Sequence, residues 1–133
     1  LAVESPDPDQ RLAALGSMML PLDSCELIDG ALELGTCDAR AYQETWDDML
    51  RLQTQGVYPA SFAAITQPVL MLHGAADPHP GPMIRASLMA SLPQLEYREW
   101  ERCGHYPWLE RAVRDDFFAV LRQWLSDQRL PDR

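Results

Sequence analysis

The apolar run Pro68-Val69-Leu70-Met71-Leu72 constrains the fold of this chain more than any other stretch of its sequence. A strand with one face in water alternates between apolar and polar residues, and this run does not alternate. Apolar side chains on both faces are typical of a parallel strand that is covered by helices on both sides. Gly74 ends the run. The sequence therefore predicts an α/β architecture.

The pattern after residue 66 predicts strand, helix, strand and helix. A helix is expected over 82–92, closed by Pro93, and a second strand over 95–100. The last helix is expected to present one apolar face, made of Val113, Phe117, Val120, Leu121, Trp124 and Leu125. Two strands joined through a helix should be parallel and form a right-handed βαβ unit.

The pattern before residue 66 is helical throughout. A first helix is expected to contain Leu12, Leu15, Met19 and Leu20 on one side and to stop at Pro21. A second is expected to begin after Asp38 as N-cap and to end at Gly56. We therefore divide the chain into a helical segment, 1–65, and a segment with two parallel strands, 66–133.

Composition excludes several classes of partner. The chain has 20 acidic and 11 basic residues, so its formal net charge of −9 opposes binding to nucleic acid or anionic lipid. No stretch has the length of a membrane span, and the three cysteines lack the spacing of a disulfide framework or zinc site. These features favour a cytoplasmic protein, and the lack of Lys and Asn suggests a bacterial source with GC-rich coding.

Two polar residues follow the two predicted strands. Asp77 stands in G-x-x-D after the first strand, and His105 stands in G-H after the second. The carboxyl ends of adjacent parallel strands meet at one edge of a sheet, where ligands bind. A histidine can move a proton when a carboxylate on its far nitrogen fixes its tautomer. We expect Asp77 to orient and His105 to transfer the proton, with Gly74 and Gly104 allowing sharp turns beside them.

Each of these residues also has a structural interpretation. Asp77 precedes a proline and could form a turn, and His105 could be a structural loop residue. His79 is expected to be a surface residue of the loop, and His73 a buried, hydrogen-bonded residue of the core. The histidine spacing matches neither H-x-x-x-H nor H-E-x-x-H, so no metal site is predicted. Cys103 is expected to be a packed, inert thiol.

The order of these elements and motifs resembles the C-terminal half of the α/β-hydrolase fold over residues 66–127. The resemblance implies that Asp77 and His105 are the acid and histidine of a nucleophile–His–Asp triad, and that residues 1–65 form a helical cap. It also implies hydrolysis of an ester, amide or related bond in a small-molecule substrate, without a cofactor. Glu110 resembles an acidic residue often found in this loop, with a structural role near a helix start.

The chain departs from that family in lacking a nucleophile elbow. The elbow requires G-x-S-x-G or its Asp or Cys variants, and no such sequence occurs here. We therefore expect the chain to be inactive alone, and to pair with an N-terminal half or to associate with itself through the edge of the 68–72 strand. Esterase, peptidase, dehalogenase and epoxide hydrolase activities all stay open. The alternative is a non-catalytic binding or assembly module.

Candidate substrate-binding residues are apolar and lie mostly in the helical segment. They are Met18, Met19, Trp46 and Trp108. Such side chains are typical of an apolar or aromatic pocket, and methionine is adaptable in shape. The competing interpretation is that they pack against the sheet.

Overall fold

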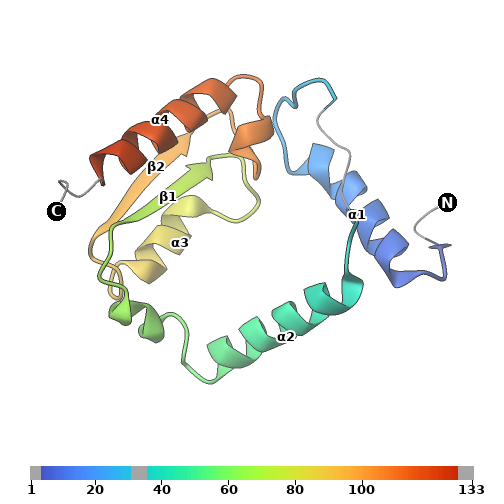
Figure 1. The fold of residues 1–133 in the computed structure, drawn as a ribbon, viewed down its shortest axis with the longest axis horizontal. Coiled ribbons are helices and arrows are strands. Elements are labelled where there is room, and N and C mark those ends of the chain that lie inside the picture. Colours follow the sequence, from blue (N-terminus) through green and yellow to red (C-terminus); the bar gives the residue numbers. More distant parts are fainter. Residues whose placement is uncertain (1–3, 31–35, 129–133) are drawn as a thin grey trace.

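The computed structural model describes residues 4–30 and 36–128 of the 133-residue chain. These residues form a mixed α/β structure with four α-helices and one two-stranded parallel sheet (Figure 1). The elements are α1 Pro8–Leu22, α2 Ala39–Thr54, the 3₁₀ helix η2 Ala60–Ala64, β1 Val69–Gly74, α3 Gly81–Leu88, β2 Leu95–Trp100, the 3₁₀ helix η3 Pro107–Leu109, and α4 Arg114–Asp127. None of the described helices combines the length and hydropathy that crossing a bilayer requires.

The sheet pairs β1 with β2 in parallel, from Val69 opposite Leu95 to Gly74 opposite Trp100. The bounds of β2 are those that the sequence predicts, whereas β1 begins at Val69 rather than Pro68 and includes Gly74, the residue expected to end it. Gly74 pairs with Trp100 at the end of the ladder. His73 is therefore the penultimate residue of the strand.

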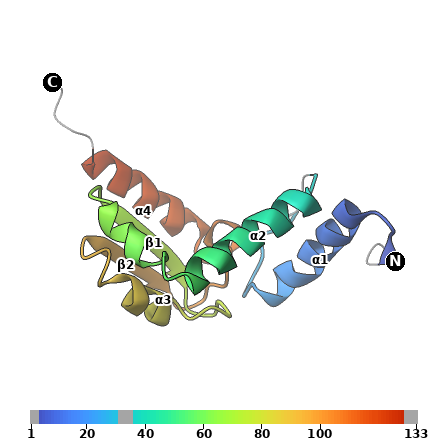
Figure 2. The same cartoon turned by 90° about the horizontal axis from the view of Figure 1, so that it is seen from below.

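Helices α3 and α4 cover opposite faces of the sheet (Figure 2). On the α4 side, the Trp124 indole donates to Glu96 at 3.0 Å, and the Trp100 indole donates to Asp116 at 2.7 Å. On the other side, the Arg85 guanidinium of α3 lies 5.5 Å from the centre of the Tyr97 ring. Glu96 and Trp100 face α4 whereas Tyr97 faces α3, because successive side chains of a strand point to opposite faces.

Two helices differ from their predicted bounds. Helix α1 does not stop before Pro21 but continues through Leu22, because a proline near a C-terminus removes only one hydrogen bond of the helix. Helix α3 ends at Leu88 rather than Leu92, and residues up to Leu92 continue as turns that bond back to the Leu88 carbonyl. Asp38 caps α2 as expected, accepting the Ala41 N–H at 2.8 Å.

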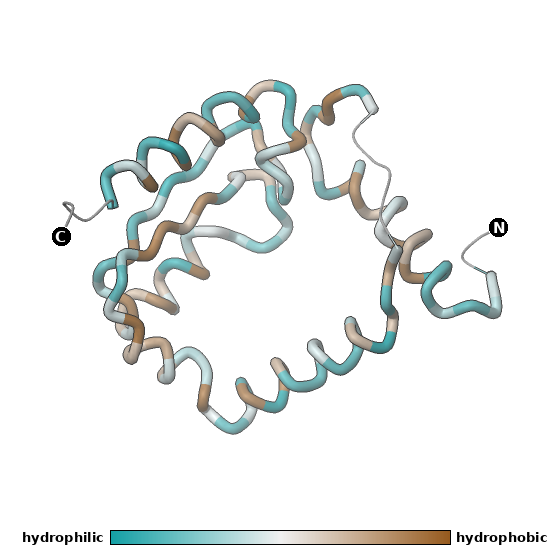
Figure 3. The backbone as a smooth tube through the Cα atoms, in the orientation of Figure 1, coloured by the Kyte–Doolittle hydropathy of each residue, from teal (hydrophilic) through white to brown (hydrophobic). Residues whose placement is uncertain are grey.

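Helix α2 lies apart from the sheet and joins it through η2 (Figure 1). None of its residues is buried, and its apolar face exposes Tyr42, Trp46 and Leu50. Strand β1 carries a continuous run of hydrophobic residues (Figure 3) and pairs on one edge only within the described chain. Both features leave apolar surface without a partner in the described structure.

Residues 23–28, the connector, follow α1 and lie against the segment after β2. The Asp23 carbonyl accepts the His105 N–H at 2.7 Å, and the Leu109 carbonyl accepts the Ile28 N–H at 2.9 Å. The Glu26 carbonyl also accepts the Arg111 N–H at 2.7 Å. The connector therefore holds the helical part of the chain to the loop that carries His105.

Candidate functional site

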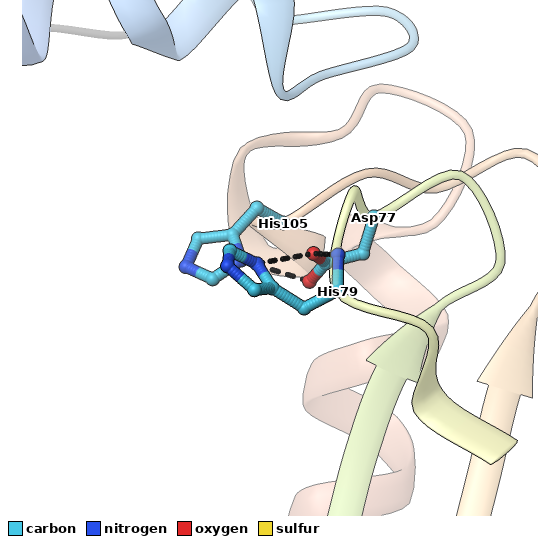
Figure 4. Close-up of side chains that lie close together, drawn as sticks. All are labelled: Asp77, His79 and His105. Carbon is cyan, nitrogen blue, oxygen red and sulfur yellow. Dashed lines mark hydrogen bonds and ion pairs between the residues drawn. The ribbon is translucent and has the colours of Figure 1, made fainter. Parts of the chain in front are cut away.

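Asp77 and His105 lie together beyond the carboxyl ends of β1 and β2. The Nδ1 atom of His105 is 2.8 Å from Oδ2 of Asp77 (Figure 4). A carboxylate can only accept a hydrogen bond here, so the ring donates from Nδ1 and carries its lone pair on Nε2. Figure 4 shows the outer edge of the His105 ring pointing away from Asp77. The side chain of Asp77 is 5% exposed and that of His105 is 44% exposed. The Nε2 atom therefore lies on the exposed side of the ring.

His79 occupies the other side of the same carboxylate. Its backbone N–H donates to Oδ1 of Asp77 at 2.8 Å, and its ring Nδ1 lies 3.1 Å from the same oxygen. The His79 side chain is 71% exposed, as expected for a surface loop residue. Its contact with Asp77 was not predicted. The signal for it is the short Asp-x-His spacing, since aspartate often accepts the N–H two residues ahead.

His73 lies beneath the carboxylate at the end of β1. It is buried, and its Nδ1 lies 2.9 Å from the Gly74 carbonyl oxygen, which confirms the predicted core histidine. Because a carbonyl oxygen only accepts, the His73 ring carries its proton on Nδ1. Its Nε2 is 3.5 Å from Oδ2 of Asp77, which is longer than a normal hydrogen bond.

The surroundings of Asp77 favour its charged form. Burial on its own raises the pKa of this carboxyl, but the hydrogen bonds from the His79 backbone and from the His105 ring outweigh burial. The pKa of Asp77 consequently lies below its ordinary value. A carboxylate that stays ionised is suited to hold an imidazole in one tautomer.

Glu110 fixes the backbone next to His105. Its side chain is fully buried, and its carboxylate accepts the N–H groups of Gly104 at 2.9 Å, Cys25 at 2.8 Å and Glu26 at 2.7 Å. Three backbone donors compensate for the burial of the charge. The structural role near a helix start that the sequence predicts for Glu110 is confirmed, because its carbonyl accepts the N–H of Arg114, the first residue of α4, at 2.8 Å. Its side chain also joins the connector to the histidine loop.

Gly74 and Gly104 serve close packing rather than sharp turns. Within the described residues, the glycines with positive φ are Gly30 and Gly56. A Cβ at Gly104 would collide with the Asp23 carbonyl oxygen, and a Cβ at Gly74 would collide with the Gly104 carbonyl oxygen. The expectation of sharp turns at these two positions is therefore wrong. They are glycine because three backbone segments meet beside the site.

Cys103 is the residue directly before Gly104. It is fully buried, and burial together with the nearby Glu110 charge raises the pKa of its thiol to about 12. A thiol in that state is a poor nucleophile. The prediction of a packed cysteine is confirmed, and its inertness toward thiol reagents stays a prediction.

The four candidate substrate-binding residues lie on three separate elements of the fold. Trp108 belongs to η3, and its ring contacts Tyr106 at 5.8 Å and Phe117 at 5.9 Å between centroids. Because the Tyr106 ring also meets the His105 ring at 4.8 Å, Trp108 connects to the site through one aromatic neighbour. Met18 and Met19 lie on α1 and Trp46 on α2, all of them exposed. Their contact with a substrate stays a prediction.

The arrangement offers a buried carboxylate, an exposed imidazole oriented by it, and a second exposed imidazole beside both. Comparison with protein-family models, with curated proteins and with solved structures found no match. The chemistry of the site is therefore argued from its geometry.

Proposed function

We propose that this chain supplies the acid and the general base of an α/β-hydrolase-type site, whose nucleophile comes from polypeptide outside these 133 residues. The observation that carries the proposal is the 2.8 Å contact between Asp77 and Nδ1 of His105. It leaves the lone pair of Nε2 on the open side of the ring, where a hydroxyl or thiol could approach.

In this proposal the two residues divide the work as in other nucleophile–His–Asp sites. His105 takes the proton of the nucleophile at Nε2 and later returns it to the leaving group. Asp77 stays ionised, holds the ring in the Nδ1–H tautomer and stabilises the imidazolium that forms. The bond that is hydrolysed is an ester, amide or related bond. A small-molecule substrate would lie against the nucleophile, with its leaving group within reach of Nε2.

The exposed apolar surface favours the view that this chain binds a partner. Among the residues that the structure describes, no strand pairs with the second edge of β1, and natural proteins protect such edges. Helix α2 exposes aromatic residues, and such apolar patches often mark binding surfaces. A sheet of two strands is also only marginally stable without further packing. The same surface favours a second candidate function, a non-catalytic assembly module that uses this edge and this helix face.

The decisive experiment begins with the coding sequence upstream of Leu1. If an in-frame continuation carries a nucleophile elbow, the longer chain is expressed and assayed for ester hydrolysis and for labelling by a fluorophosphonate. The longer chain should react, and the present 133 residues alone should not. Asp77→Asn should lower turnover by about 10⁴-fold, as should His105→Ala, because either change removes the oriented base. Asp115→Asn is the matched control, since that side chain is fully exposed on α4.

Retained activity in both Asp77→Asn and His105→Ala would disprove the assignment. A continuation without an elbow would favour the assembly module instead. Labelling of the present chain alone would show that it contains a nucleophile, contrary to the proposal.

A further inference from the structure

We propose that Asp77, His79 and His105 also form a binding site for one zinc ion. Each residue offers one ligand atom, and these atoms all lie within 4.8 Å of one another. Figure 4 shows both imidazole rings turned toward the same carboxylate, from the loop after β1 and the loop after β2. This inference does not depend on the proposed hydrolase function.

The three ligand atoms could surround a single small ion after the two exposed rings rotate toward each other. Zinc binds imidazole nitrogen at about 2.0–2.1 Å and carboxylate oxygen at about 2.0–2.2 Å, which places two ligand atoms of a tetrahedral ion roughly 3.3 Å apart. The Nδ1 atom of His105 is now 2.8 Å from Oδ2 of Asp77, and the Nδ1 atom of His79 is 3.1 Å from Oδ1 of the same carboxylate. The ligand atoms of the three residues are at most 4.8 Å apart. Both rings are well exposed, so they can rotate toward one ion without displacing the core.

The carboxylate is the fixed member of the set. Its side chain is 5% exposed, and the His79 backbone N–H holds one of its oxygens in place. The buried His73 ring borders its other oxygen. One ligand held in position lowers the entropy that a metal site loses when its ligands are ordered.

The ligand types favour zinc over the common hard cations. Two imidazoles and a carboxylate suit zinc, whereas magnesium and calcium prefer oxygen ligands alone. Three protein ligands leave a fourth position open, as in catalytic zinc sites. Each neutral ring binds the ion through Nδ1 after its proton moves to Nε2, so coordination by the rings releases no proton overall.

Zinc binding and the oriented tautomer of His105 exclude each other. The ion takes the place of the proton that Nδ1 of His105 now shares with Asp77, and Nε2 then becomes the protonated nitrogen. The ring consequently loses the lone pair that faces open space. Bound zinc should therefore hold this site in a form in which His105 cannot act as a base.

The test uses the full 133-residue chain, freed of metal with a chelator and titrated with zinc by calorimetry and against a chromophoric zinc indicator. We expect one zinc ion per chain. His79→Ala should weaken binding by about tenfold or more, as should Asp77→Asn, because each removes a direct ligand. Asp115→Asn and Cys25→Ser are the controls and should bind as the unchanged chain does. Circular dichroism checks that every variant is folded.

Substitution with cobalt provides a second readout. Visible bands of a four-coordinate ion without a thiolate charge-transfer band would support the site. Three results would overturn it: a Kd weaker than about 100 µM, unchanged affinity in both His79→Ala and Asp77→Asn, or loss of binding in Cys25→Ser. None of these measurements needs hydrolase activity, so the failure of one proposal is distinguishable from the failure of the other.

Discussion

The carboxylate of Glu110 accepts the backbone N–H of Gly104 at 2.9 Å, and Gly104 directly precedes His105. The same carboxylate holds the N–H groups of Cys25 and Glu26, more than 80 residues away in the chain. A single buried side chain thus determines where the histidine loop and the connector meet.

Replacing Glu110 by glutamine should destabilise the fold. The side chain keeps its size, but an amide group would turn a donor toward backbone N–H groups that need an acceptor. Hydrogen bonds to charged groups contribute about 1.5–3 kcal/mol each, so we expect a loss of about 2–4 kcal/mol in the free energy of unfolding. Urea denaturation measures it. Glu101→Gln, at an exposed position, is the control. Equal stability of the two variants would contradict the role given to Glu110.

Gly104→Ala should cost more stability than Gly56→Ala. An alanine at Gly104 collides with the Asp23 carbonyl, and relieving such overpacking typically costs about 1–3 kcal/mol or more. Gly56 has a φ of +69° but no atom within 4 Å of its missing Cβ, so alanine there costs about 1–2 kcal/mol from the left-handed backbone alone. Thermal unfolding of both variants gives the order. The reverse order would show that the contact at Asp23 relaxes without cost.

Cys103 should resist thiol reagents that modify Cys25. The Cys103 side chain is fully buried and its pKa is raised to about 12, whereas Cys25 is exposed. Iodoacetamide at pH 8 followed by peptide mapping should find the label on Cys25 and not on Cys103. In urea both should react. Rapid labelling of Cys103 in the folded chain would mean that the loop before His105 opens readily.

Asp116 should make part of the stability dependent on pH. The Trp100 indole N–H and the Arg98 guanidinium lower the pKa of its carboxyl. A carboxyl with a lowered pKa in the folded state stabilises the fold above its unfolded pKa, and this contribution is lost as the pH falls through the folded pKa. Asp116→Asn should thus be less stable than the unchanged chain at pH 6, and the difference should shrink toward pH 3. A difference that is constant over this range would argue against the predicted shift.

The isolated chain should associate with itself through its exposed apolar surface. Analytical ultracentrifugation over a range of concentrations should show dimers or larger species. The double variant Tyr42→Glu with Trp46→Glu should weaken them, because it places two charges on the apolar face of α2. Arg40→Glu changes the net charge by the same amount at a side chain that is 87% exposed, and it should have a smaller effect. A monomer at high concentration would contradict this expectation.

The strand pattern carried most of what the sequence revealed about the fold. A run without alternation predicted a parallel strand, and β1 and β2 are parallel with α3 and α4 on opposite faces. The meeting of Asp77 and His105 follows from the same logic, since each stands just beyond the end of one strand. Their catalytic roles, the cap assignment of residues 1–65 and the hydrolase resemblance stay predictions.

The contacts of the connector could not be predicted. They run from side chain or backbone to backbone groups that every residue type possesses, so they leave no signature in the sequence. The ends of α1 and α3 differ for a related reason, because local turns and a single proline shift helix ends by a few residues. His79 was placed correctly on the surface, but its exposure alone did not reveal its bond to Asp77.

The connector has a mechanical consequence for the site. Asp23 is the C-cap of α1, and its carbonyl oxygen accepts the His105 N–H at 2.7 Å. The end of the helix is therefore bonded directly to the main chain of the histidine. The loop of Asp77 is bonded to the same segment, since the Ala76 N–H donates to the Cys103 carbonyl at 2.9 Å. The end of α1, the loop of Asp77 and the loop of His105 thus form one hydrogen-bonded unit, and the pair of side chains rests on all three segments.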